Sequence, residues 1–78
     1  MKFKNVKNLK KLFEIIDSCY GRVDLVSQDM VLNLKSNLAK YFAFSQLVSD
    51  GIVEEMELRA YDSEDIAKLT KFMMEGNE

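Results

Sequence analysis

Two hydrophobic periods alternate along this 78-residue chain, and the change from one to the other limits the folds that it can adopt. Apolar residues between positions 6 and 19 recur every three or four residues, as they do on the buried face of a helix. From Val23 to Leu34 the period is two, which is typical of paired strands with one buried face. The chain is therefore predicted to combine helices with an antiparallel sheet.

The same patterns predict the whole order of elements. Helices are expected over residues 6–19, 37–48 and from 63 onward, strands over 23–26, 31–34 and 55–60, and a candidate short extra strand over 1–4. Helices that cover one face of such a sheet form an α+β two-layer open-faced sandwich. We expect residues 1–78 to be a single domain, with an antiparallel sheet of three strands, or four with the extra one, covered on one face by three helices.

Composition excludes several classes of function. The chain has eleven basic and thirteen acidic residues, so it lacks the positive excess that drives binding to nucleic acid. It contains no histidine and one cysteine, Cys19, which excludes an internal disulfide, a Cys/His zinc cluster and a Ser-His-Asp triad. The carboxylates lie on predicted solvated faces, so no catalytic residue, metal or cofactor is expected.

The chain has no segment suited to a membrane. No apolar run approaches the ~20 residues that cross a bilayer, and no apolar core follows the first lysines as in a signal peptide. These features predict a cytoplasmic protein without a membrane partner.

Three stretches resemble the second half of HPr, the histidine-containing phosphocarrier of the bacterial sugar phosphotransferase system. They are Val-Leu-Asn-Leu-Lys-Ser-Asn-Leu at 31–38, Glu-Leu-Arg-Ala at 57–60 and Ser-Glu-Asp-Ile-Ala-Lys-Leu at 63–69. The resemblance covers about residues 22–74, and it implies a sheet in which the first strand lies at an edge, beside the strand before the last helix. HPr carries its phosphoryl group on a histidine, which this chain lacks, so the phosphocarrier chemistry is not inherited.

The resemblance singles out Ser36. It matches a serine that a dedicated kinase phosphorylates in HPr of Gram-positive bacteria and in a regulatory branch without the catalytic histidine. A helix N-terminus favours an anion, and we expect Lys35 and Lys40 to support it. The alternative is that Ser36 is only the N-cap of the second helix, which stabilises it by about 1 kcal/mol.

The second predicted helix is rich in apolar side chains. Its expected core stripe includes Phe42, so Phe44 and either Tyr41 or Leu47 are expected to face elsewhere and to form a surface for a partner. The alternative is that both flanks of the helix pack inward. Cys19, at the end of the first predicted helix, is expected to be a small buried hydrophobe.

These patterns predict a non-catalytic, HPr-like regulatory or adaptor protein that acts through contacts with another protein or with itself as a homo-oligomer. The alternative is a small structural or oligomerising interaction domain unrelated to the sugar phosphotransferase system.

Overall fold

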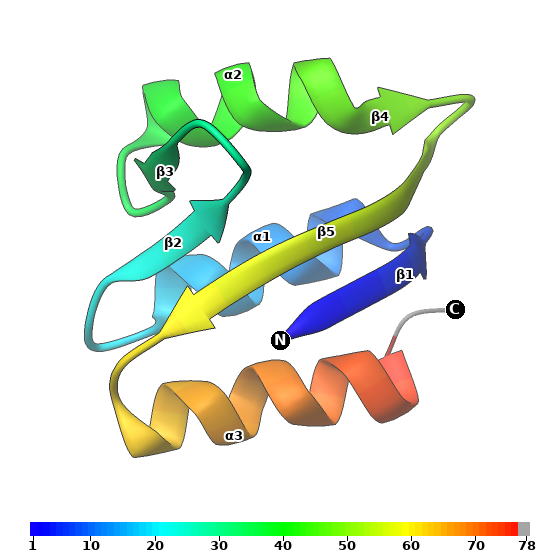
Figure 1. The fold of residues 1–78 in the computed structure, drawn as a ribbon. Helices are drawn as coiled ribbons and strands as arrows, with labels where there is room; N and C mark the ends of the chain where they lie inside the picture. The colour runs from blue at the N-terminus through cyan, green and yellow to red at the C-terminus, as the bar shows by residue number, and fades with distance from the viewer. Residues whose placement is uncertain (77–78) are drawn as a thin grey trace.

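The computed structural model describes residues 1–76 and has the expected α+β architecture (Figure 1). Its helices are α1 (Leu9–Ser18), α2 (Asn37–Leu47) and α3 (Ser63–Lys71), and α3 continues into the π-helical segment η1 (Phe72–Gly76). Its strands are β1 (Lys2–Val6), β2 (Val23–Val26), β3 (Val31–Asn33), β4 (Val48–Ser49) and β5 (Ile52–Ala60).

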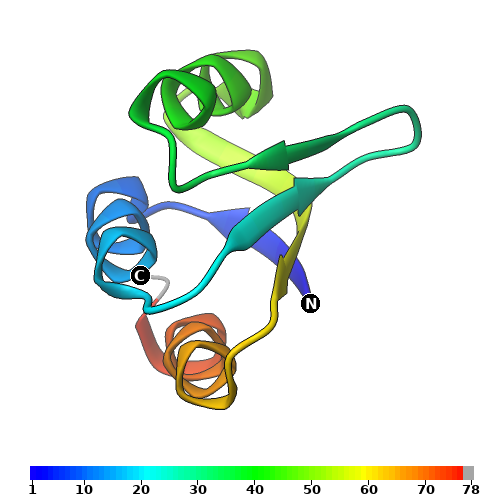
Figure 2. The ribbon, with the colours of Figure 1, turned by 90° about the vertical axis from the view of Figure 1, so that its left-hand side faces the viewer.

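The sheet has five strands within the described part of the chain, one more than the largest number expected. The order is β1-β5-β2-β3, and β4 pairs with the beginning of β5; every pairing is antiparallel. The helices lie along one side of this sheet, and the loop between β2 and β3 projects beyond the body of the fold (Figure 2). The predicted two-layer open-faced sandwich is confirmed.

The first segment is a strand where a helix was expected to begin. The candidate strand over 1–4 exists and extends to Val6, which lies opposite Val53 of β5. The helix begins only at Leu9, because the Asn8 side chain accepts a hydrogen bond from Lys11 N (3.1 Å) and caps it. The prediction of a helix from residue 6 was therefore wrong. Val6 is buried because it belongs to the sheet, and its three-residue spacing from Leu9 is a coincidence.

Strand β4 was not predicted, and a tight turn joins it to β5. Asp50 and Gly51 both have positive φ, 54° and 76°, between the paired residues Ser49 and Ile52. Two consecutive positive φ angles are typical of the type I′ turn that joins antiparallel strands, and Asp-Gly is a favoured pair for it. The residues that end α2 thereby return directly along β5.

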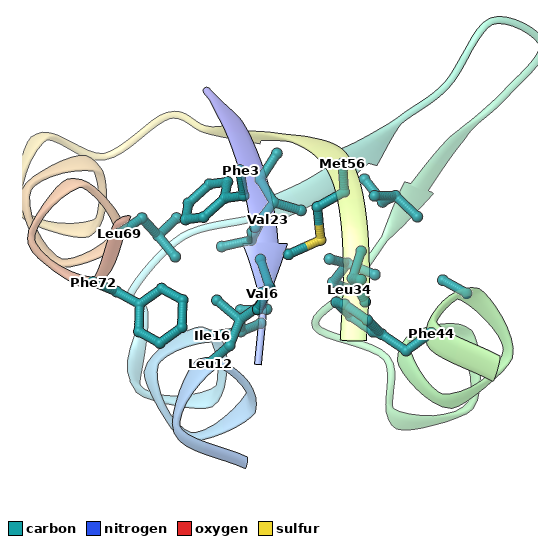
Figure 3. Packing of buried hydrophobic residues seen from close by; sticks show 14 of the residues in the cluster. Phe3, Val6, Leu12, Ile16, Val23, Leu34, Phe44, Met56, Leu69 and Phe72 are labelled. Carbon is teal, nitrogen blue, oxygen red and sulfur yellow. The ribbon is translucent and has the colours of Figure 1, made fainter. Parts of the chain in front are cut away.

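The hydrophobic core lies between the sheet and the helices, and every major element contributes to it (Figure 3). Phe3 from β1 meets Phe72 of η1, with ring centroids 6.2 Å apart, while Phe44 enters the core from α2. Truncation of a buried phenylalanine to alanine typically costs about 3–5 kcal/mol. The core therefore depends on both ends of the chain as well as on its middle.

The side chain of Asp65 links α3 to the turn between α1 and β2 through hydrogen bonds. Its buried carboxylate accepts hydrogen bonds from Tyr20 N (2.9 Å) and Gly21 N (2.8 Å), while Asp62 caps α3. Burial alone would raise the pKa of Asp65, but the two backbone N–H groups and Lys68 outweigh it and hold the pKa below its ordinary value. Asp65 therefore remains ionised at neutral pH.

Cys19 is buried at the end of α1, as predicted. Its Sγ lies 3.2 Å from the Ile15 carbonyl oxygen, to which it donates. Burial, followed by the negative charge of Asp65, raises the pKa of the thiol. Cys19 is therefore held as a neutral thiol.

Candidate interaction surface

Helix α2 begins at Asn37, and Ser36 before it has the geometry of an N-cap. Its φ and ψ are −82° and 124°, and its Oγ accepts a hydrogen bond from Ala39 N at 3.4 Å. The capping role proposed as the alternative for Ser36 is thus confirmed, and the side chain is exposed at the start of the helix. Phosphorylation of this hydroxyl remains a prediction.

Lys35 is engaged away from Ser36, at the end of α1. Its Nζ donates to the carbonyl oxygens of Ile16 (3.2 Å), Asp17 (3.3 Å) and Cys19 (2.7 Å). Helix α1 has no basic residue in its own last turn, so Lys35 supplies from a distant segment the positive charge that a helix C-terminus favours. This contradicts the expectation that Lys35 supports an anion at Ser36.

The side chain of Lys40 also binds α1. Its side chain is 3% exposed, and its Nζ lies 2.7 Å from the Asp17 carboxylate. The ammonium group also lies 5.3 Å from the centre of the Phe13 ring and 5.9 Å from that of Tyr41. The expectation that Lys40 supports an anion was therefore wrong, because burial beside Asp17 satisfies its charge.

Helix α2 buries a different face from the one predicted. Phe44 is 3% exposed and packs edge-on against Phe13 with centroids 4.7 Å apart, whereas Phe42 is 55% exposed. The buried stripe consists of positions 40, 43 and 44, with 47 half-buried at the same spacing. Because this stripe starts with a lysine whose apolar stem is buried, apolar periodicity alone does not reveal it. The assignment of Phe44 to a partner surface was therefore wrong.

Four large apolar side chains stay exposed on α2 and on the neighbouring hairpin. We call this set the α2 face; its members and their exposed fractions are Leu38 (82%), Tyr41 (64%), Phe42 (55%) and Met30 (50%). Of the three residues expected to meet a partner, Tyr41 belongs to this face, although its ring also lies nearly perpendicular to that of Phe13, with centroids 6.3 Å apart. Leu47 packs partly against the core. Leu38 precedes Tyr41 and Phe42 by three and four positions, so these three side chains adjoin on the surface of α2, and an exposed apolar patch is typical of an interaction surface.

A groove separates the hairpin from α2. Its volume is about 280 Å³, and it is lined by Leu25, Ser27, Met30, Leu32, Phe42, Ala43, Gln46 and Leu47. Pockets for small molecules usually measure about 300–1,000 Å³, so this groove is better matched to one or two apolar side chains of a protein. Leu47 thus contributes to the surface by lining the groove.

The structure also reveals a buried carboxylate that the alternating pattern of β2 had placed on the solvated face. Asp24 is buried, and its two oxygens accept from Arg22 Nε (2.6 Å) and from the Tyr61 hydroxyl (2.8 Å). The hydrogen bond and the charge of Asp24 raise the pKa of the Arg22 guanidinium. Both oxygens are engaged, so the arrangement fits a structural role.

Within residues 1–76 the structure contains no cluster of three side chains able to hold a metal ion and no helix long and apolar enough to span a bilayer. Comparison of the chain with models of protein families, with curated proteins and with solved structures found no match.

Proposed function

We propose that this chain is a non-catalytic, HPr-like regulatory or adaptor domain that acts through protein contacts made by the α2 face. The observation that carries the proposal is the composition of that face. Met30, Leu38, Tyr41 and Phe42 are large apolar side chains at about half or more of their full exposure. The centres of protein interfaces are enriched in aromatic residues and methionine and depleted of charge.

The strand arrangement supports the HPr-like part of the proposal. Strand β1 lies at the edge of the sheet beside β5, and β5 is the strand that precedes the last helix. The resemblance to HPr implies this same arrangement. The chain nevertheless has no histidine to carry a phosphoryl group. A scaffold of this kind can present surfaces to partners without transferring phosphate.

Ser36 is the proposed regulatory position. Its hydroxyl is exposed next to the α2 face, at the N-terminus of a helix, where backbone N–H groups and the helix dipole favour an added phosphate. The stabilisation expected from the dipole is about 1 kcal/mol or less. Since Lys35 and Lys40 are held by α1, a phosphate here relies on the backbone alone unless it draws Lys35 away from its three carbonyls.

Phosphoryl transfer tests the proposal directly. Purified protein is incubated with radiolabelled phosphoenolpyruvate and the first general enzyme of the sugar phosphotransferase system, and separately with labelled ATP and HPr kinase. We expect no label from the first enzyme, and label from the kinase that the Ser36→Ala variant abolishes. Label transferred to any side chain by the first enzyme would refute the non-catalytic role.

Substitutions test the surface. Tyr41→Glu and Leu38→Glu each place a charge on the α2 face, and Met74→Glu places the same charge on an equally exposed apolar residue in η1. We expect a partner captured by the wild type to be retained by Met74→Glu and lost with both α2 variants. Equal capture of the partner by all three variants would show that the α2 face does not bind it.

One observation favours the alternative of an interaction domain unrelated to sugar transport. Both lysines expected to assist a phosphate are occupied by α1, which leaves Ser36 with the local geometry of a simple cap. Ser36→Ala and Ser36→Asp distinguish the two functions. If neither changes partner binding while Tyr41→Glu does, the serine acts only as a cap and the alternative is correct.

A further inference from the structure

A second groove lies between α1 and α3, on the other side of α1 from the α2 face. Figures 1 and 2 both show α1 between the two other helices. The volume of the groove is about 230 Å³, and it is lined by Lys11, Ile15, Lys68, Lys71, Phe72 and Glu75. Ile15 is half-buried and Phe72 is buried, so these two side chains form an apolar floor beneath a rim of charged residues.

Two of the three lysines on this rim have ammonium groups that are available to a ligand. The Lys68 ammonium is engaged, because it donates to the Ser18 carbonyl oxygen (3.2 Å) and lies 4.8 Å from the centre of the Tyr20 ring. Within residues 1–76, the ammonium groups of Lys11 and Lys71 make no hydrogen bond or ion pair. The lysine stems extend the apolar wall of the groove, while the two charged ends remain in solvent, where an anion can reach them.

The groove is positively charged although the chain is acidic. Three lysines and one glutamate line it, a net charge of +2 (3 − 1), whereas the whole chain has a net charge of −2. The exposed charged residues that flank the groove on either side balance one another, two lysines against two glutamates, and Asp17 on the α2 side of α1 is paired with Lys40. The flanking residues are Lys7, Lys10, Glu14 and Glu64. The charge of the groove therefore favours an anionic partner.

The start of α1 has charges that its own stability does not favour. A helix N-terminus is stabilised by negative charge, yet the first turn of α1 has no acidic residue and contains Lys10 and Lys11. Departures from such local preferences are expected mainly at functional or strained sites. An anion bound at this end of the groove would compensate both the lysines and the helix dipole.

The shape of the groove distinguishes between anionic partners. It is smaller than the usual 300–1,000 Å³ or so of a small-molecule pocket, and its charged groups are flexible lysines instead of fixed polar groups. Clusters that bind anionic lipids usually contain about four to eight basic residues, and a flat membrane surface does not fill a recess. A helix laid between α1 and α3 fills it, because such a helix inserts apolar side chains and presents its flanking residues to the rim.

We propose that the groove between α1 and α3 binds an acidic amphipathic helix of another protein. An apolar side chain of this helix rests on Ile15 and Phe72, and carboxylates on its two flanks pair with Lys11 and Lys71. This surface is separate from the α2 face and differs from it in charge. The domain can therefore hold two different partners at once, which goes beyond the proposed function.

Titration of the isotope-labelled chain with synthetic peptides, followed by the amide chemical shifts, tests the groove. The probe is a helical peptide of about 15 residues with leucine at every third or fourth position and glutamate on both flanks. Two comparison peptides replace its glutamates by lysine or its leucines by alanine. We expect the acidic leucine peptide to shift amides of α1 and α3 around the groove, and both comparison peptides to bind at least about tenfold more weakly.

Single substitutions test the rim. Lys11→Gln and Lys71→Gln should each weaken binding of the acidic peptide about twofold to fivefold, and together about tenfold. Arg59→Gln is the matched control, because it removes the same charge from an exposed residue of β5 that lies on the other face of the sheet from buried Leu58. This variant should bind the peptide like the wild type.

Three results would overturn the proposal. They are the absence of shifts around the groove at about 1 mM acidic peptide, equal binding of the lysine peptide, and binding to vesicles of phosphatidylcholine and phosphatidylserine but not to the peptide. The last result would assign the groove to a membrane surface. The proposed function is tested separately, because a partner held by the α2 face should still be captured by the Lys11→Gln variant.

Discussion

Replacement of Lys35 by methionine should weaken the whole fold through one helix end. Methionine keeps an unbranched stem of similar length but removes the ammonium group that donates to three carbonyl oxygens at the C-terminus of α1. A hydrogen bond to a charged group contributes about 1.5–3 kcal/mol, and a cation at a helix C-terminus contributes up to about 2 kcal/mol in partly buried geometry. These contributions describe the same interaction, so we expect a loss of about 2 kcal/mol in the free energy of unfolding.

The measurement is urea unfolding followed by circular dichroism, with the midpoint compared at equal slope. In thermal unfolding, the same loss of about 2 kcal/mol corresponds to a fall of about 8–16 °C in Tm for a domain of this size. Lys10→Met is the matched control, because Lys10 is an exposed residue on α1 and should change stability by less than about 0.5 kcal/mol. If Lys35→Met behaved like Lys10→Met, the end of α1 would not depend on Lys35.

Three further predictions concern single residues. Because the folded-state pKa of Asp65 is lowered, the stabilising effect of its carboxylate is complete above the ordinary carboxyl pKa and disappears as pH falls through the lowered value. Asp65→Asn should therefore be less stable than the wild type at pH 7. Unfolding curves measured at decreasing pH should show this difference in stability narrowing below about pH 3.9. Cys19 should react with a disulfide reagent at pH 8 at least about a hundredfold more slowly in native protein than in urea, and equal rates would contradict its burial and raised pKa. Gly51→Ala should lower stability by about 1–2 kcal/mol in thermal unfolding, because φ is 76° while no atom within 4 Å obstructs a Cβ; an unchanged Tm would argue against the type I′ turn.

The quality of prediction differed between elements for identifiable reasons. Helix α3 was predicted well because its signals are local: Asp62 caps it, Glu64 and Asp65 occupy its first turn, and lysines follow in its last. Strand β4 was missed because two residues are too short to show a period. Its local signal is the Asp50-Gly51 pair, whose positive φ angles form the turn between β4 and β5.

The candidate site was predicted in part. Tyr41 is exposed on α2 as one of the expected alternatives, and Ser36 caps the helix. The roles of Phe42 and Phe44 were exchanged, because the stripe was traced through apolar residues only and Lys40 was excluded from it. No rule based on neighbouring residues places a lysine inside, since burial of its amine depends on a partner charge elsewhere in the fold.

The sequence alone determined the alternation of helices and strands, the residues at which α2 and α3 begin, and the absence of histidine. Those properties depend on residues a few positions apart, or on composition. Tertiary structure decided that Lys35 and Lys40 serve α1, because their acceptors at Ile16, Asp17 and Cys19 lie far away in the chain. That long-range pairing turns Phe44 inward and leaves the other side of α2 apolar, uncharged and exposed.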